Sequence, residues 1–127
     1  MSECSDSMAN ILLVDDSMTF REELKMDLVQ AGHIVLEAVN GEEGLKLAVE
    51  GNIDLIISDL NMPKMDGLTM CSHIREQGIN TLIFMLTTQT NPELKAQAAK
   101  LQIKAWIVKP YNKSVLINGI AKVLSLK

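Results

Sequence analysis

Five short apolar runs divide the chain, and the segments between them have helical periodicity. Most residues of each run are apolar, without a polar residue at every second position, which is typical of strands covered on both faces of a parallel sheet. The pattern predicts a doubly wound α/β fold with five parallel strands, five helices and right-handed crossovers. The runs are Ile11–Val14, Ile34–Val39, Ile53–Ile57, Leu82–Leu86 and Ala105–Val108.

Caps and glycines divide the intervening segments into five predicted helices. Asn91 followed by Pro92 is the strongest start signal, because a capping residue precedes a proline at the first helical position. In the second helix, Leu45 and Val49 are expected to face inward. The predicted helices run from about 17 to 29, 41 to 50, 67 to 77, 91 to 101, and onward from about 112.

The length and composition allow one domain. With 127 residues, 47% of them hydrophobic, residues 9–127 are expected to form a single domain after a loose tail at residues 1–8. The longest unbroken apolar run, Leu82–Leu86, is far shorter than the roughly 20 residues of a membrane span. The polar, acidic start has no signal-peptide pattern, so a cytoplasmic protein without membrane insertion is expected. Cys4 and Cys71 are too few for a disulfide framework or a zinc site.

Charge is divided unevenly along the chain. Residues 1–91 hold 15 acidic and five basic side chains, whereas residues 92–127 hold seven lysines and one acid, Glu93. This predicts an acidic site from the first part and a basic face from the second, which would bind an acidic protein segment rather than nucleic acid. The alternative is that the lysines lie on solvated helix faces. The candidate partner-binding residues are Lys95, Lys104, Lys113 and Lys122, together with Trp106.

Polar side chains follow four of the five predicted strands. Asp15 and Asp16 follow the first, Asp59 the third, Thr87 the fourth and Lys109 the fifth. Because ligands of such sheets bind beyond the carboxyl ends of the strands, these side chains are expected to share one site. Each alone has a local explanation as a cap, a turn former or a surface charge. Their joint placement at one edge of the sheet favours a site.

The composition of this site suits a metal ion and phosphoryl transfer. Three clustered carboxylates raise one another's pKa unless a cation offsets them, and oxygen ligands suit Mg²⁺. An aspartate beside Mg²⁺, with Lys109 and a hydroxyl nearby, can attack phosphorus and form an aspartyl phosphate.

Other phosphate chemistries fit the sequence less well. A phosphatase of the haloacid dehalogenase type needs a second aspartate two residues after its nucleophile, where Asp59 is followed by Asn61. A flavin carrier needs a phosphate-binding turn after the first strand, where this chain has two acids, and no Gly-rich nucleotide loop is present. His33 and His73 lack any catalytic context and are expected at the surface.

Together these residues resemble the receiver domain of two-component response regulators. The resemblance covers residues 9–127, and because no further domain fits in the chain it is strongest to the stand-alone chemotaxis regulators of the family. It implies a flavodoxin-like strand order of 2-1-3-4-5, which is carried over from the family. The motifs that carry it are Asp15-Asp16, Asp59-Leu60-Asn61-Met62-Pro63-Lys64-Met65-Asp66-Gly67, Thr87 and Lys109-Pro110.

The resemblance implies a signalling switch, and not an enzyme beyond slow self-dephosphorylation. A sensor histidine kinase would phosphorylate Asp59, and the Lys109-Pro110 bond would be cis. Thr87 and Lys109 would bind the phosphoryl oxygens. The implied magnesium site has Asp16, Asp59 and the backbone carbonyl of Asn61 as direct ligands, with Asp15 acting through water.

The resemblance also implies how the signal leaves the domain. Trp106 stands where the family has Tyr or Phe, and it would turn inward when Thr87 moves toward the phosphoryl group. The fourth helix, fifth strand and last helix would then bind a downstream protein, with the flagellar motor switch as the expected target of a monomeric chemotaxis regulator. The alternative is a phosphate sink or phosphorelay intermediate in another two-component pathway.

Overall fold

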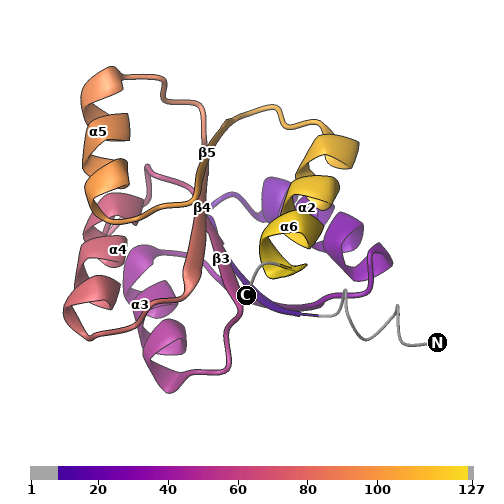
Figure 1. The fold of residues 1–127 in the computed structure, drawn as a ribbon, viewed down its shortest axis with the longest axis horizontal. Helices are drawn as coiled ribbons and strands as arrows, with labels where there is room; N and C mark the ends of the chain where they lie inside the picture. The colour runs from indigo at the N-terminus through magenta and orange to yellow at the C-terminus, as the bar shows by residue number, and fades with distance from the viewer. Residues whose placement is uncertain (1–8, 126–127) are drawn as a thin grey trace.

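Five parallel strands form the sheet of the protein in the order β2-β1-β3-β4-β5 (Figure 1). The computed structural model describes residues 9–125, so the tail predicted at residues 1–8 lies outside the described residues. The predicted class and strand order are confirmed. The strands are β1 (Asn10–Val14), β2 (Ile34–Ala38), β3 (Leu55–Ser58), β4 (Leu82–Thr87) and β5 (Ala105–Val108).

Helices cover both faces of this sheet. Two of them lie on one face, α2 (Met18–Gln30) and α6 (Lys113–Ser125), as Figure 1 shows. The other face carries α3 (Gly41–Glu50), α4 (Gly67–Glu76) and α5 (Pro92–Lys100). The predicted cap at Asn91 is confirmed, because its side chain accepts a hydrogen bond from the Glu93 N–H group. Ser17 caps α2 in the same way, by accepting from the Phe20 N–H group. None of the helices in residues 9–125 is long and apolar enough to cross a membrane.

Successive strand residues point into two separate cores. Leu12 and Ile56 pack in the cluster beneath α3, α4 and α5. Ile11 and Ile57, their chain neighbours, pack in the cluster beneath α2 and α6. Because both faces are buried, the central strands are apolar except at one terminal residue each, Asn10, Ser58 and Thr87.

Two expectations about burial are wrong at the β2 edge of the sheet. β2 pairs only with β1, and its residues Ile34 and Leu36 are 52% and 41% exposed, so it is not covered on both faces. Val49 is 48% exposed instead of facing inward. The buried side of α3 consists of Gly41, Gly44 and Ala48 instead, and these small residues bring the helix close to its neighbours. A Cβ atom added to Gly44 would lie 2.7 Å from Sδ of Met70 on α4.

The prediction of a surface position is also wrong for His33, which lies between α2 and β2. Its side chain is 5% exposed, and burial lowers the pKa of the imidazole. Within the described residues, its buried Nδ1 atom makes no hydrogen bond. His73 is partly exposed on α4, as expected, with Nδ1 3.3 Å from Oε1 of Glu76.

Candidate functional site

The carboxyl ends of β1 and β3 bring three carboxylates together. These strands are neighbours, with Val14 opposite Ser58, so the residues that follow them meet at one edge of the sheet. One carboxylate oxygen from each of Asp15, Asp16 and Asp59 lies within 4.8 Å of the others. The three aspartates that were predicted to share a site are therefore adjacent in space.

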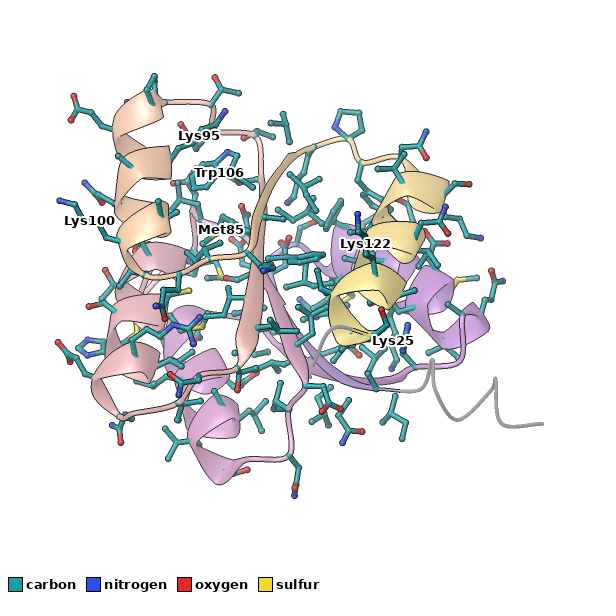
Figure 2. All side chains as sticks on the ribbon, viewed as in Figure 1. Lys25, Met85, Lys95, Lys100, Trp106 and Lys122 are labelled. Carbon is teal, nitrogen blue, oxygen red and sulfur yellow. The ribbon has the colours of Figure 1, made fainter. Side chains whose placement is uncertain are left out.

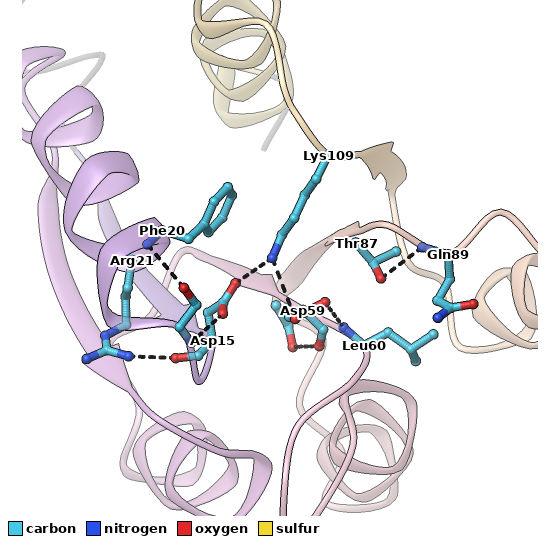
Figure 3. A network of polar contacts seen from close by, with 10 residues as sticks. Asp15, Phe20, Arg21, Asp59, Leu60, Thr87, Gln89 and Lys109 are labelled. Carbon is cyan, nitrogen blue, oxygen red and sulfur yellow. Dashed lines mark hydrogen bonds and ion pairs between the residues drawn. The ribbon is translucent and has the colours of Figure 1, made fainter.

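Lys109 reaches this cluster from the end of β5. Its Nζ lies 3.0 Å from Oδ2 of Asp15 and 3.5 Å from Oδ2 of Asp59 (Figure 3). The same atom is 4.0 Å from the centre of the Phe20 ring. The Lys109-Pro110 peptide bond is cis. One ammonium faces three carboxylates, so the site keeps an excess of negative charge.

The surroundings of Asp59 disfavour the ionised form of its carboxyl group. Its side chain is 13% exposed, and this burial is the main cause that raises its pKa above the ordinary value. The charge of Asp15 raises the pKa further, whereas Lys109, the Leu60 N–H group and a hydrogen bond with Thr87 lower it. The Leu60 N–H group donates to Oδ1 of Asp59 at 2.7 Å. A bound cation would therefore favour the ionised carboxylate.

The other two acids differ in how their oxygens are used. Asp15 is buried, and its carboxylate accepts hydrogen bonds from the Ser17 N–H group at 2.9 Å and from Lys109. Asp16 is exposed beside it. This arrangement leaves the Asp16 carboxylate more accessible than that of Asp15 to a cation.

The predicted site also includes Thr87 and Asn61. Thr87 is buried at the end of β4, and its Oγ1 accepts a hydrogen bond from the Gln89 N–H group at 3.3 Å (Figure 3). Asn61 is exposed in the turn after Asp59. That turn is closed at its base, because the Gly67 N–H group donates to the carbonyl of Leu60 at 2.8 Å.

Three residues that support the site, Phe20, Arg21 and Ser58, were not identified from the sequence, whereas Gly67 belongs to the motif that begins at Asp59. Phe20 contacts Lys109, and Arg21 donates from Nη1 to the carbonyl of Asp15 at 2.7 Å. Ser58 donates to the carbonyl of Asp59 at 2.7 Å, and a Cβ atom on Gly67 would collide with that same carbonyl. For Arg21 a signal was present, since it shares the buried face of α2 with Leu24 and Leu28.

The predicted partner-binding residues lie away from the carboxylates. Lys95, Lys104 and Lys122 are exposed on or next to α5, β5 and α6, and Figure 2 shows Lys95 and Lys122 on opposite sides of β5. Lys113 is exposed too, but its Nζ is 3.4 Å from Oδ1 of Asp27 and bonds to Gln30 Oε1 at 3.1 Å. Its charge is therefore partly offset by α2.

Trp106 is half-buried on β5. Its indole Nε1 donates to the carbonyl of Gln89 at 2.9 Å, and its ring packs against the core beneath α3, α4 and α5 (Figure 2). The indole thus joins β5 to the segment that follows Thr87.

Comparison with known proteins assigns the family. Residues 11–121 match the response regulator receiver domain, and the chain belongs to this family. Chemotaxis protein CheY of Treponema pallidum is 34% identical over 117 residues, which are 90% of this chain and 81% of that protein. Transcriptional regulatory protein ResD of Bacillus subtilis is 38% identical over 102 residues, which cover 80% of this chain but only 42% of ResD.

Solved structures agree with this assignment. Chemotaxis response regulator CheY4 of Vibrio cholerae is 39% identical, with a TM-score of 0.83 over 91% of this chain and 98% of that one. Response regulator TrrA of Thermotoga maritima, solved in complex with Mg(2+)-BeF, is 34% identical, with a TM-score of 0.82 over 91% of this chain and 99% of that one. The chain is thus a receiver domain of the two-component type that resembles CheY, and such domains are signalling proteins rather than ordinary enzymes.

Proposed function

We propose that the chain is a phosphorylation-activated signalling switch, with Asp59 as the phosphoacceptor and a sensor histidine kinase as the donor. The observation that carries this proposal is the cluster of Asp15, Asp16 and Asp59, in which one oxygen from each lies within 4.8 Å of the others and Lys109 contacts Asp15 and Asp59. An acidic cluster of this kind with a single lysine is suited to bind a divalent ion and a phosphoryl group together.

The residues present fit Mg²⁺. All three side chains offer hard oxygen ligands, and the exposure of Asp16 leaves room for the water molecules that Mg²⁺ keeps. Asp16, Asp59 and the carbonyl of Asn61 would hold the ion directly. Asp15 would act through water, because its oxygens already accept from Ser17 and Lys109. When bound, the ion would neutralise charge on the phosphoryl oxygens.

Asp59 would then act as a nucleophile. One of its carboxylate oxygens forms a bond to phosphorus while the phosphorus–nitrogen bond of the donor phosphohistidine breaks. The electron pair of that bond leaves with the imidazole, which takes a proton from water. The Lys109 ammonium and the Thr87 hydroxyl bind the phosphoryl oxygens and hold them in line for this transfer.

The output surface in this proposal is the face of α5, β5 and α6. Movement of Thr87 toward the phosphoryl group would pull the segment whose Gln89 carbonyl holds Trp106, so the indole could report the switch. The lysines would bind an acidic segment of a downstream protein, Lys113 more weakly than the others because of Asp27. They are Lys95, Lys104, Lys113 and Lys122.

The pathway we propose is chemotaxis, with a cytoplasmic monomer acting on the flagellar motor switch. Similarity to CheY proteins over most of their length supports this choice. The second candidate is a phosphate sink or relay in another two-component pathway. It is favoured by the similarity to transcriptional regulators such as ResD, of which the chain spans less than half. Deletion of the gene should abolish directed swimming in the first case and leave it intact in the second.

Mass spectrometry tests the phosphoacceptor. The intact protein incubated with acetyl phosphate should gain one phosphoryl group in Mg²⁺ and none in excess chelator. Asp59→Asn should gain none. Asp54→Asn is the matched control, because Asp54 lies at the opposite end of β3 and its amide can still accept from the Asn10 N–H group. Phosphorylation of Asp59→Asn, or phosphorylation without Mg²⁺, would overturn the assignment.

A further inference from the structure

The ammonium of Lys109 has an aromatic neighbour in addition to its two carboxylates. Its Nζ lies 4.0 Å from the centre of the Phe20 ring, which is within the range of a cation–π interaction (Figure 3). Phe20 is in the first turn of α2, and its N–H group donates to the Ser17 cap at 3.3 Å. Lys109 therefore lies between the ends of β1 and β3 on one side and a helix-borne ring on the other.

The Phe20 ring is itself held in place by the segment that follows Lys109. The ring of Tyr111 meets it edge to face, with centroids 5.7 Å apart and planes at 86°. The Tyr111 hydroxyl donates to Oδ2 of Asp27 at 2.7 Å, and Lys113 lies 3.4 Å from Oδ1 of the same carboxylate. Burial and Asp27 raise the pKa of Tyr111, so the hydroxyl remains a donor. The contacts of Tyr111 and Lys113 with Phe20 and Asp27 thus attach the segment after Lys109 to α2.

Without the ring, the ammonium would be open to water. Phe20, Tyr111 and Lys109 are among the residues that line one open cavity of about 530 Å³. A lysine has a long, flexible stem and a strongly hydrated ammonium, so neighbouring groups decide where the charge lies. A flat aromatic face on one side limits both hydration and the number of positions that the ammonium can take.

We propose that Phe20 is a positioning residue, whose ring holds the Lys109 ammonium between Asp15 and Asp59 where it can receive the phosphoryl group. This inference rests on the proposed function, because it assigns Phe20 a role in phosphorylation of Asp59. Phe20 touches neither the phosphoryl group nor the metal in this proposal and acts through Lys109. A simple packing role for Phe20, which also adjoins the core beneath α2 and α6, makes a different prediction.

A double-mutant cycle separates the two roles. The rate of Mg²⁺-dependent phosphorylation by acetyl phosphate is measured by mass spectrometry for Phe20→Leu, which keeps apolar bulk but loses the ring. We expect a loss of about 3- to 10-fold, the scale of a partly desolvated cation–π contact. Phe20→Tyr keeps a ring face and should stay within about twofold of the wild type. In a Lys109→Ala background, Phe20→Leu should cause no further loss.

Two results would overturn the proposal. One is an unchanged rate in Phe20→Leu, and the other is an equal loss in the presence and absence of Lys109, which would show that the ring acts only through packing. Urea unfolding checks that each variant is folded, and Phe20→Met replaces Phe20→Leu in the cycle if that variant is unfolded. A wild-type protein that takes no phosphoryl group would contradict the proposed function instead, so the two failures are distinguishable.

Discussion

Two partly buried cations lie at opposite ends of the sheet and have opposite kinds of partner. Arg75, on α4, donates to four backbone carbonyls in the segments that lead into β4 and β5. Lys109, at the end of β5, faces carboxylates. The acceptors of Arg75 are neutral and fixed in the backbone, whereas those of Lys109 are charged and outnumber it. The four carbonyls are those of Ile79, Thr81, Leu101 and Gln102.

The contacts at the amino ends of the strands therefore serve stability, whereas those at the carboxyl ends serve function. At the amino ends, one guanidinium satisfies carbonyls that would otherwise lack partners, so the contacts stabilise the fold. At the carboxyl ends, burial raises the pKa of Asp59 above its ordinary value, and the charge of Asp15 adds to this effect while Lys109 opposes it. The charge there is incompletely balanced, and a metal ion or phosphoryl group can change that balance. Removal of a charged group should therefore change the stability in opposite directions at the two ends.

Arg75→Met should have the largest effect on stability. It removes all four hydrogen bonds while keeping an apolar stem, and bonds to charged groups are worth about 1.5–3 kcal/mol each before losses overlap. We expect urea unfolding to show a loss of about 3 kcal/mol, with Arg75→Lys losing about half of that because an ammonium cannot match the planar fork. Phosphorylation of the folded fraction should persist. Loss of phosphorylation at unchanged stability would contradict the separation of the two ends.

Gly41→Ala should lower the free energy of unfolding by about 2 kcal/mol, because it overpacks a close backbone contact at the carboxyl end. The Gly41 N–H group donates to the carbonyl of Met65 at 3.2 Å, and an added Cβ atom would collide with that carbonyl. Since Met65 belongs to the turn that carries Asn61, Mg²⁺ affinity measured by titration calorimetry should also fall. Gly119→Ala, in α6 with no atom within 4 Å of the added Cβ, is the control and should keep or raise stability.

Most of the fold and the acidic site were predictable, because their signals are local. The residues after each apolar run mark the carboxyl edge of a parallel sheet, so Asp15, Asp59 and Lys109 could be grouped before any contact was known. The partners of Arg75 lie up to 27 residues away along the chain, and no local pattern identifies them. Contacts such as Phe20 with Lys109 depend on how α2 lies against the loop after β5, which is decided by tertiary packing.

Two predictions about burial, those for Val49 and His33, were wrong because the packing of their neighbours does not follow the apolar periodicity. Val49 has the spacing of an inward residue, but α3 packs through Gly41, Gly44 and Ala48 and turns Val49 outward. His33 failed in the opposite direction, because a single histidine next to a glycine gives no sign that a helix end and a strand start will cover it.

Asp59→Asn should stabilise the metal-free protein by about 1 kcal/mol at pH 7, the scale of a single buried polar group. The folded state disfavours the ionised carboxylate, and the amide removes that charge while it can still accept from the Leu60 N–H group. Mg²⁺ should raise the melting temperature of the wild type and raise that of the variant much less. A variant that is less stable than the wild type without metal would show that Lys109 already balances the site.

His33 gives the smallest expected effect on stability. It tests whether the buried polar groups at the amino ends of the strands all have hydrogen-bond partners. Burial lowers the pKa of this imidazole in the folded state, so the unfolded chain takes up a proton first as the pH falls below about 6.5. The stability that the neutral imidazole contributes is therefore present above that pH and is lost toward acid. Between pH 8 and pH 6 the loss of stability from this one group is at most about 0.8 kcal/mol.

Urea unfolding should be compared between the wild type and His33→Gln. At pH 6 the difference in stability should shift against the wild type by up to this amount. His73→Gln, on α4, separates the loss of a buried histidine from the loss of a histidine in general. A wild-type advantage that is constant over this range, or that grows toward pH 6, would mean that the imidazole of His33 gains a partner when it is protonated.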